Sequence, residues 1–459
     1  MMETGSHRMT DTQREAELFE AGRMARARVP RSAFAGFTPN PHRNPIAILQ
    51  QQHLSRLPDL VPLRVERMSA SPFAFYRGTA AVQAADLARE PTSGANVVMC
   101  GDAHVNNFGV YRSPEGAMVF DSDDFDEAFV GPWEWDVKRL VTSVVLAGRS
   151  GKMDADLLRR AVESTAAAYR DELRRLQTRP LYERYFTATT ADPNHVTLGE
   201  SSEKIAQILK KAGKRTSERV ARRILHRNDS GAMRFIEQPP VLTHVGDEIR
   251  DLVDRLLDQY SRTVPPDVAL MLQQYRVVDV ARRVVGVGSV GTRCFIVALA
   301  DATEDITILQ IKEANMSVVH EFGGISEADS YFDSPLLMQD HGYRVVSCQR
   351  VLQAVSDPFL GHLGIDAFHF YARLFRNNNA SFELSEMTAD DFRSYVRACA
   401  VVLARGHARS PQMAHAAGYL GSGSAFVRAV TEWAHQYADQ AELDYAAFID
   451  AARSGAFTL

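Results

Sequence analysis

Residues 286–297 read Gly-Val-Gly-Ser-Val-Gly-Thr-Arg-Cys-Phe-Ile-Val, a GxGxxG string that runs directly into strand-forming residues. The glycine pattern alone is typical of dinucleotide-binding turns, of phosphate-binding loops between strands and of accidental turns. A dinucleotide-binding turn must open a helix whose N-terminus holds the pyrophosphate, whereas Thr292–Val297 favours a strand. The stretch therefore predicts a glycine loop that joins two strands, with its backbone amides laid over the phosphates of a nucleotide.

A lysine ends the hairpin that is predicted after this loop. Residues 293–299 and 306–311 are rich in β-branched and apolar side chains, and a polar turn separates them. Lys312 follows Gly291 by 21 residues and is expected to neutralise the phosphates. A strand lysine is more often simply exposed, so this role depends on the glycine loop beside it. The predicted cofactor-binding residues are Gly286, Val287, Gly288, Ser289, Val290, Gly291 and Lys312, and Lys312 is also a catalytic candidate.

A second polar loop, Gly101-Asp102-Ala103-His104-Val105-Asn106-Asn107, follows a short apolar run at 97–99 that predicts a strand. The loop brings together a carboxylate, an imidazole and a side-chain amide. A carboxylate here could orient or deprotonate an attacking hydroxyl, and Asn107 could supply a neutral oxygen to Mg²⁺. Asp102 and His104 are therefore candidate catalytic residues. The alternative is an Asx-rich turn that satisfies its own backbone.

Four aspartates and one glutamate crowd into residues 121–127, directly after a predicted strand at 117–120. An isolated acidic run is usually a solvated loop. Here bulky neighbours such as Phe125 and Trp133 would half-bury the cluster, and buried carboxylates need counter-ions. The cluster is accordingly predicted to bind metal. The candidate ligands are Asp121, Asp124 and Asp126, together with Asn107.

These elements together match a phosphoryl-transfer site, but they occur in an unusual chain order. The predicted catalytic loop and metal-binding aspartates precede the glycine loop and Lys312 by about 180 residues. Such a circular permutation is physically permissible, because active-site geometry and not chain order decides the chemistry. We expect an α+β fold of two lobes, similar to that of protein kinases and circularly permuted, with large helical additions.

Helical periodicity fills most of the remaining chain. Asp154 is placed to cap a helix that ends near residue 177, and Thr388 with Asp391 forms a plausible capping box. Further helices are expected at 203–227, at 248–260 and from Pro265-Pro266 to about 283, and another strand at 367–376.

Four parts follow from this pattern. Residues 1–60 are expected to form an N-terminal arm, of which 1–9 are interpreted as a cloning remnant. Residues 61–280 would form a helical lobe with the catalytic loop and the metal site, residues 281–385 a small β-rich nucleotide-binding lobe, and residues 386–459 C-terminal helices that pack on the large lobe.

The chain of 459 residues has a formal net charge of −5 and 24% charged residues. This composition is typical of a globular protein, and its near-neutral balance argues against a nucleic-acid-binding protein. The four cysteines lie far apart without metal-binding spacing, so they are interpreted as buried thiols of a reducing compartment. No apolar run is long enough to cross a bilayer, and no signal peptide is evident. We expect a cytoplasmic protein without a membrane or nucleic-acid partner, and the sequence leaves its oligomeric state open.

From about residue 65 to residue 455, the sequence resembles a bacterial family known as domain of unknown function 2252. The motifs that carry this resemblance are spread over most of the chain, and the family name implies no activity. They are Ser71-Pro72-Phe73-Ala74-Phe75-Tyr76-Arg77-Gly78, Cys100-Gly101-Asp102-Ala103-His104, Asp123-Asp124-Phe125-Asp126-Glu127, Gly131-Pro132-Trp133-Glu134-Trp135-Asp136, Val285–Arg293, Gln310-Ile311-Lys312-Glu313-Ala314, Gln349-Arg350, Ala404-Arg405-Gly406-His407-Ala408-Arg409 and Tyr437-Ala438-Asp439-Gln440.

A more distant similarity concerns the aminoglycoside and choline phosphotransferases. Their HGDxHxxN loop is similar to residues 100–107, with Cys100 in place of the first histidine. This resemblance implies that Asp102 is the catalytic base and Asn107 a metal ligand. It also implies that Asp124 is the principal magnesium ligand, with Asp121 and Asp126 as rivals or partners, and that a structural aspartate, Asp136, opens a helix. The glutamate that would pair with Lys312 is expected among Glu313, Glu321 and Glu327.

The sequence thus predicts an ATP- and Mg²⁺-dependent phosphotransferase that acts on a hydroxyl group of a small molecule or other acceptor, which residue types alone do not identify. One alternative is a nucleotide-binding sensor that resembles a pseudokinase. Another is a nucleotidyl transferase that moves AMP with the same residues. A metallophosphoesterase built on Gly101-Asp102 is less consistent with the sequence, because the downstream Gly-Asn-His-Asp of that class is not found.

Overall fold

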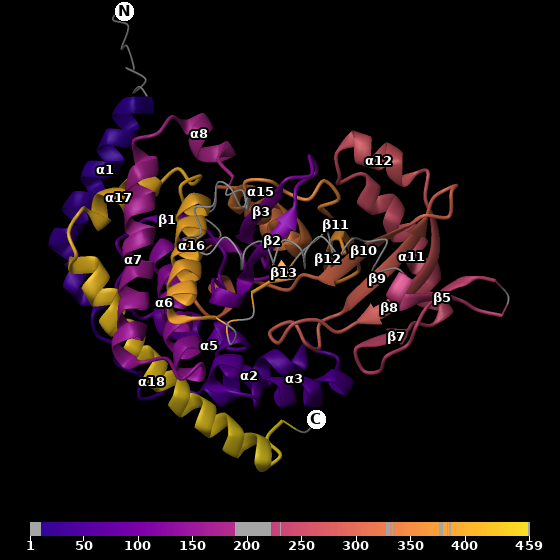
Figure 1. The fold of residues 1–459 in the computed structure, drawn as a ribbon, viewed down its shortest axis with the longest axis horizontal. Helices are drawn as coiled ribbons and strands as arrows, with labels where there is room; N and C mark the ends of the chain where they lie inside the picture. Colours follow the sequence, from indigo (N-terminus) through magenta and orange to yellow (C-terminus); the bar gives the residue numbers. More distant parts are fainter. Residues whose placement is uncertain are drawn as a thin grey trace, which may run out of the picture.

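The computed structural model describes residues 11–188, 222–229, 231–326, 331–332, 334–375, 380–382, 384 and 387–457. Helices crowd one side of the molecule, a six-stranded antiparallel sheet occupies the other, and shorter strands lie between them (Figure 1). We call these two sides the helical part and the sheet part. The expectation of a mixed α+β fold is confirmed.

The helical part is built from both ends of the chain around one central helix. This helix, α6 (Trp133–Ser150), is buried along nearly its whole length and packs against α7 (Ala155–Gln177) and α18 (Ala425–Arg453). Apolar and aromatic side chains fill the contacts, and Trp133 stacks on Tyr169 with ring centroids 5.7 Å apart. The other helices here are α1 (Asp11–Arg28), α2 (Pro45–Leu54), α3 (Val61–Met68), α4 (Pro72–Arg77), α5 (Ala80–Leu87), α8 (Leu181–Phe186), α16 (Ala389–His407) and α17 (Met413–Leu420), with short 3-10 turns at Arg31–Phe34 and Pro58–Leu60.

Short antiparallel strands carry the two polar loops that the sequence singled out. The strand predicted at 97–99 is confirmed as β1, which leads into the first loop, and the strand predicted at 117–120 is confirmed as β3, which leads into the second. β1 pairs with β4, and β2 pairs with both β3 and β13. Their bounds are β1 (Asn96–Met99), β2 (Phe108–Arg112), β3 (Met118–Ser122), β4 (Phe129–Pro132) and β13 (Ala380–Ser381), with a 3-10 turn at Val105–Asn107.

The sheet part contains the predicted hairpin at its centre. Its strands follow the order β11-β12-β10-β9-β8-β7, and all neighbours are antiparallel. The hairpin of β9 and β10 places Lys312 opposite Cys294, and the strand predicted at 367–376 is confirmed beside it as β12. The bounds are β7 (Leu242–His244), β8 (Arg276–Arg283), β9 (Cys294–Ala300), β10 (Ile306–Glu313), β11 (Gly361–Ile365) and β12 (Phe368–Leu374).

Both faces of this sheet are covered. On one face, α11 (Asp247–Ser261) and α12 (Pro266–Leu272) bury apolar residues such as Tyr260 against Val297 and Ile311. On the other face, the hairpin of β5 (Leu225–Arg227) and β6 (Met233–Phe235) packs Phe235 against Ile296. Between the two parts of the molecule lies α15 (His341–Leu352), which contacts β11, β12 and α16. The short helix α13 (Val318–Glu321) contacts α5 and β4, and α14 (Ser334–Gln339) contacts α15.

The C-terminal ends of two expected helices are wrong. The helix expected to continue to residue 283 ends at Leu272 and gives way to β8, because Val277, Val278 and Val280 favour a strand and can pack within the sheet. Residues 225–227, expected to end the helix at 203–227, form β5 instead, and residues 203–221 lie outside the described residues.

Two helix caps that the sequence predicted are confirmed. The side chain of Asp154 accepts hydrogen bonds from the backbone N–H groups of Asp156 and Leu157, each at 3.0 Å. Thr388 and Asp391 form the reciprocal capping box at the start of α16. These caps are readable in the sequence because they involve residues only three positions apart.

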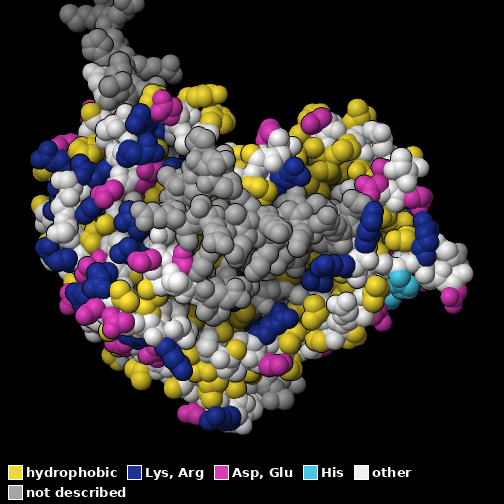
Figure 2. Space-filling model, viewed as in Figure 1, with side chains coloured by type: hydrophobic (Ala, Val, Ile, Leu, Met, Phe, Trp, Pro, Cys, Tyr) yellow, Lys and Arg dark blue, Asp and Glu magenta, His cyan; other side chains and the backbone are white. Residues whose placement is uncertain are grey.

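Charged side chains of both signs are interspersed over the face of the molecule seen in Figure 2. The four cysteines are buried and unpaired, as predicted. Within the described part of the chain, no helix combines the length and the apolar character needed to span a bilayer.

The N-terminal helix α1 crosses α17 at unusually short range. A Cβ atom on Gly22 would lie 2.0 Å from the carbonyl oxygen of His415, and one on Gly418 would lie 2.0 Å from that of Phe19. Arg26 Nε donates to the carbonyl of Tyr419 at 2.9 Å, and Arg31 Nη1 donates to that of Leu420 at 2.8 Å. These arginines thereby satisfy carbonyls that α17 leaves free at its C-terminal end.

We predict that Gly22→Ala lowers the free energy of unfolding by about 1–3 kcal/mol, because the added methyl must push the two backbones apart. Chemical denaturation monitored by circular dichroism measures the change. Gly423→Ala is the matched control, since a Cβ at that position meets nothing within 4 Å. Equal stability of the two variants would contradict the close crossing.

Candidate active site

One buried aspartate binds the backbone at the start of the loop at 100–107. Asp136, in the first turn of α6, accepts hydrogen bonds from the backbone N–H of Cys100 at 2.6 Å and of Gly101 at 3.0 Å. His407, at the C-terminal end of α16, contacts the same carboxylate through Nε2 at 3.1 Å and is held in turn by the hydroxyl of Tyr169. Asp136 thus has the structural position, at the opening of a helix, that the resemblance implied.

Gly101 is required where the first loop meets the acidic segment. Its φ is +74°, and a Cβ atom would lie 2.2 Å from the carbonyl oxygen of Glu127. A side chain there would be strained and would also collide with the backbone. Glycine therefore allows the loop that carries Asp102 to pack directly against residues 124–127.

Asp102 is bound to the protein by an arginine from the same central helix. Arg139 Nε donates to its Oδ1 at 2.8 Å, and the Nδ2 of Asn107 donates to its backbone carbonyl at 2.8 Å. Burial raises the pKa of Asp102 above its ordinary value, and the positive charge of Arg139 opposes this rise. His104 Nε2 lies 3.8 Å from Asp102 Oδ2, and burial holds the pKa of this imidazole well below its ordinary value.

The carboxylates of the acidic segment at 121–127 have two different sets of partners. Asp121 accepts hydrogen bonds from the backbone N–H of Ser122 at 2.9 Å and of Ala354 at 3.1 Å. Burial raises its pKa to about 6. Asp124 and Asp126 instead face Lys312 of the sheet part. Of the three predicted aspartates, Asp124 and Asp126 line the same cavity as Asp102, and Asp121 does not.

Lys312 pairs with two of these carboxylates at once. Its Nζ lies 3.5 Å from Asp124 Oδ1 and also contacts Asp126 Oδ2. Burial by itself would lower the pKa of Lys312, but the two carboxylates raise it well above its ordinary value. Asp126 further accepts hydrogen bonds from Ser289 Oγ at 2.9 Å and from the hydroxyl of Tyr371 at 2.8 Å. Although burial opposes it, the Lys312 charge keeps the pKa of Asp126 below its ordinary value.

The glycine loop joins β8 and β9, as the sequence predicted, and lies over this cluster. Two residues near α3 donate hydrogen bonds to carbonyl groups of this loop. Arg67 Nη1 donates to the carbonyl of Gly286 at 2.6 Å, and the backbone N–H of Leu57 donates to the carbonyl of Gly291 at 2.8 Å. By contrast, the N–H groups of Val287, Gly288 and Ser289 form no hydrogen bond with the described residues. They remain available for an anion.

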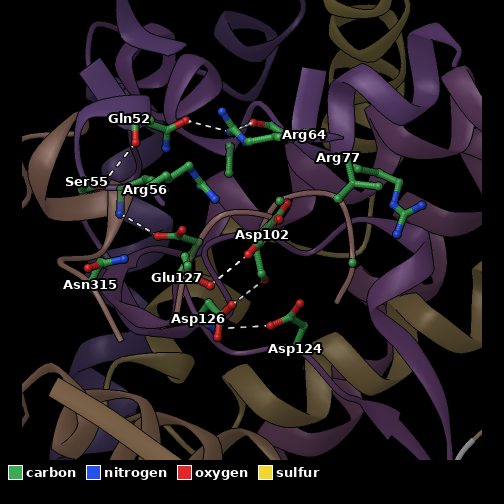
Figure 3. A pocket seen from close by; sticks show the side chains of 18 of the residues that line it. Gln52, Ser55, Arg56, Arg64, Arg77, Asp102, Asp124, Asp126, Glu127 and Asn315 are labelled. Atoms are coloured by element: carbon green, nitrogen blue, oxygen red, sulfur yellow. Dashed lines mark hydrogen bonds between the residues drawn. The ribbon is translucent and has the colours of Figure 1, made fainter. Parts of the chain in front are cut away.

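Two cavities meet at this site. The first encloses about 490 Å³ and is lined by Asp102, His104 and Asp126, and the second encloses about 310 Å³ and is lined by Lys312 and Arg373. Figure 3 shows the first cavity, with the carboxylates of Asp102, Asp124, Asp126 and Glu127 gathered on one side. The wall that both cavities share consists of Arg77, Asn107, Asp124, Gly286 and Ser289.

Most of the predicted site residues therefore converge, although they come from distant parts of the sequence. Val290 and Gly291 shape the glycine loop without lining either cavity. None of the expected glutamates is seen to pair with Lys312: Glu313 binds Arg293, Glu321 accepts from Gln51, and Glu327 lies outside the described residues. Across the described ranges, no group of three or more His, Cys, Asp or Glu side chains is placed to hold a metal ion.

Several side chains of the site were not singled out from the sequence. Arg139 could have been found, because it lies three residues after Asp136 and thus on the same face of α6. Arg56, Arg64 and Arg77 carry no such local signal, since only the packing of α2, α3 and α4 against the loops brings them to the first cavity.

The chain belongs to a bacterial family. Residues 56–451 match the family described as an uncharacterized protein conserved in bacteria, DUF2252, which covers most of the chain and agrees with the resemblance seen in its motifs. No curated protein and no solved structure matches this chain.

We predict that Asp136→Asn lowers the free energy of unfolding by about 1–3 kcal/mol, because it weakens the acceptor for two buried N–H groups and removes the charge beside His407. Urea denaturation measures the loss. Asp439→Asn is the control, since Asp439 pairs with Arg149 but its side chain is 65% exposed, and it should change stability by less than about 0.5 kcal/mol. A similar change in both variants would contradict the role of Asp136.

Proposed function

We propose that this protein is an ATP- and Mg²⁺-dependent phosphotransferase with a circularly permuted, kinase-like arrangement of its two parts. The observation that carries the proposal is the shared wall of the two cavities. There the glycine loop, contributed by Gly286 and Ser289, meets Asn107 and Asp124, which precede it by more than 160 residues in the sequence. The likeness of residues 100–107 to the loop of the aminoglycoside and choline phosphotransferases supports the same assignment.

The chemistry follows from the positions of these groups. The oxygen of an acceptor hydroxyl forms a bond to the γ-phosphorus of ATP, the bond from this phosphorus to the β–γ bridging oxygen breaks, and ADP leaves. Asp102 accepts the hydroxyl proton, and Arg139 keeps its carboxylate in place. A buried carboxylate with a raised pKa is a better proton acceptor than an exposed one.

The nucleotide side of the site is assigned to Lys312 and the glycine loop. The unengaged N–H groups of Val287, Gly288 and Ser289 suit phosphate oxygens, and the buried ammonium of Lys312 supplies a positive charge next to them. Here Lys312 pairs with Asp126, whereas ordinary kinases pair the strand lysine with a glutamate on a helix.

The residues present also fit a magnesium ion. The amide nitrogen of Asn107 is engaged by Asp102, which leaves its carbonyl oxygen as the free donor, and Asp124 offers a carboxylate. Both are oxygen ligands, which Mg²⁺ prefers, and a kinase-type ion needs few protein ligands because phosphates and water complete its shell. This agrees with the lack of a three-residue cluster among the described residues. The ion would neutralise charge on the phosphates.

We predict that Asp102→Asn abolishes turnover while Mg-ATP still binds, because the substitution removes the proton acceptor but leaves the glycine loop and Lys312 intact. ADP release in the presence of a library of hydroxyl compounds measures turnover, and isothermal titration calorimetry measures binding. Asp258→Asn, on the exposed face of α11, is the control and should behave like the wild type.

The products of this assay separate the alternatives. Release of AMP-modified acceptor and pyrophosphate instead of ADP would identify a nucleotidyl transferase, and binding without any product would identify a nucleotide sensor. Undiminished turnover by Asp102→Asn would show that the role assigned to this carboxylate is wrong.

We predict that Lys312→Met weakens Mg-ATP binding at least tenfold, because it removes the positive charge that is assigned to the phosphates. Within the described residues, no other Lys or Arg side chain forms an ion pair with Asp124 or Asp126. The dissociation constant from calorimetry is the readout. Ser289→Ala should weaken binding less, since it removes one hydroxyl from the same loop. If Lys312→Met bound Mg-ATP as tightly as the wild type, the nucleotide would lie elsewhere.

A further inference from the structure

Three arginines line the first cavity and are not used by the proposed transfer step. Arg56 follows α2, Arg64 lies in α3, and Arg77 is the last residue of α4. In Figure 3 they lie around the carboxylates of Asp102 and Asp124, with Arg56 and Arg77 on opposite sides. The cavity therefore presents both positive and negative side chains to a ligand.

Arg64 is the most unusual of the three because it is almost completely enclosed. Its exposed fraction is 1%, yet it donates only to neutral acceptors, namely Gln52 Oε1 at 3.2 Å and the Gly78 carbonyl at 3.1 Å. Its Nε and Nη1 atoms have no hydrogen-bond partner among the described residues. Burial holds the pKa of this guanidinium well below its ordinary value. A buried cation in this state is stabilised when an anion completes its hydrogen bonds.

Arg56 and Arg77 show the same incomplete pairing. Arg56 donates to the carbonyl of Val290 through Nη1, and its buried Nε has no partner in the part of the chain that the structure describes. Burial lowers the pKa of Arg56 to about 10. The buried Nε of Arg77 is likewise without a partner in the described ranges.

The acidic residues of the cavity do not supply the missing anion, because each is engaged elsewhere. Arg139 binds Asp102, Lys312 binds Asp126, and the backbone N–H of Val318 binds Glu127 at 2.8 Å. Glu313 pairs with Arg293. Within the described residues, no carboxylate lies within 4.0 Å of a nitrogen of Arg56, Arg64 or Arg77.

We propose that the acceptor is a hydroxyl compound that carries a phosphate or carboxylate group, and that Arg56, Arg64 and Arg77 bind this anionic group in the first cavity. The inference rests on the proposed function. Guanidinium groups suit oxyanions because they donate several hydrogen bonds in fixed directions. With the anionic group at the arginines, the hydroxyl group of the acceptor can reach Asp102, which lines the same cavity.

The nucleotide is assigned to the glycine loop and the second cavity. Lys312 and Arg373 line only the second cavity, whereas Asp102, Arg56 and Arg64 line only the first. The glycine loop borders both, because Val287 and Gly288 line the first cavity and Ser289 belongs to the shared wall. The two ligands then meet at Asn107 and Asp124, and both can be bound at the same time. Simultaneous binding distinguishes this arrangement from one in which the arginines hold the phosphates of ATP.

The experiment titrates the protein with two probes, inorganic phosphate and malonate, alone and in the presence of a non-hydrolysable ATP analogue with Mg²⁺. Calorimetry gives the dissociation constants. We expect at least one probe to bind, and its affinity to change less than threefold when the analogue is present. Arg64→Gln should weaken binding of this probe at least tenfold without changing the affinity for the analogue. The preferred probe shows whether the acceptor is phosphorylated or carboxylated.

Arg56→Gln is the second variant, and it keeps the test decisive if replacing the deeply buried Arg64 prevents folding. Arg56→Gln should also weaken binding of the probe at least tenfold. The control is Arg262→Gln, whose side chain is 76% exposed and which should bind both probes like the wild type. Circular dichroism verifies that each variant is folded.

The other outcomes are equally decisive. Failure of both probes to bind, or unchanged binding by Arg56→Gln, would overturn the inference. Displacement of the probe by the ATP analogue would assign the arginines to the nucleotide and overturn it as well, while leaving the phosphotransferase proposal intact. Probe binding that depends on the arginines, in a protein that does not bind the analogue, would instead contradict the proposed function and leave an anion site.

Discussion

The buried contact of Lys312 with Asp124 and Asp126 is the interaction on which the rest of the site depends. A lone ammonium at the depth of Lys312 would cost several kcal/mol in lost hydration, so the sheet part could not keep this charge buried without the carboxylates of Asp124 and Asp126. Asp126 also accepts hydrogen bonds from Ser289 in the glycine loop and Tyr371 in β12. One carboxylate thus sets the position of three elements of the sheet part relative to the helical part.

The catalytic loop depends in a similar way on α6. Asp136 and Arg139 lie on the same face of that helix, and they hold the backbone and the side chain of the loop respectively. Because α6 is buried by helices from both ends of the chain, the loop is anchored to the main hydrophobic core of the molecule. Asp102 is thereby fixed in the first cavity, which Arg56 and Arg64 also line.

Those features that arise from neighbouring residues could be predicted from the sequence. The β9–β10 hairpin follows from a run of β-branched residues, the caps at Asp154 and Thr388 follow from short-range spacing, and the two polar loops follow from strands that end in clusters of Asp and Asn. The sequence could not show which of Asp121 and Asp124 lies at the site. Asp121 belongs to β3 and Asp124 follows it, and the sequence does not say which face of this strand meets the site. β8 was mistaken for helix because its valines also fit a helical period, and Arg64 gained its place only through the packing of α3.

The crossing of α1 with α17 bears on what constitutes the smallest folded unit. The family match begins at residue 56, yet the C-terminal carbonyls of α17 are capped by Arg26 and Arg31, and Phe19 lies in backbone contact with Gly418. At the other end, Phe457 packs on Phe448 beyond the limit of the match at residue 451. A fragment cut to the limits of the match would expose apolar surface and unpaired carbonyls at both ends. The region that matches the family is therefore shorter than the packed structure.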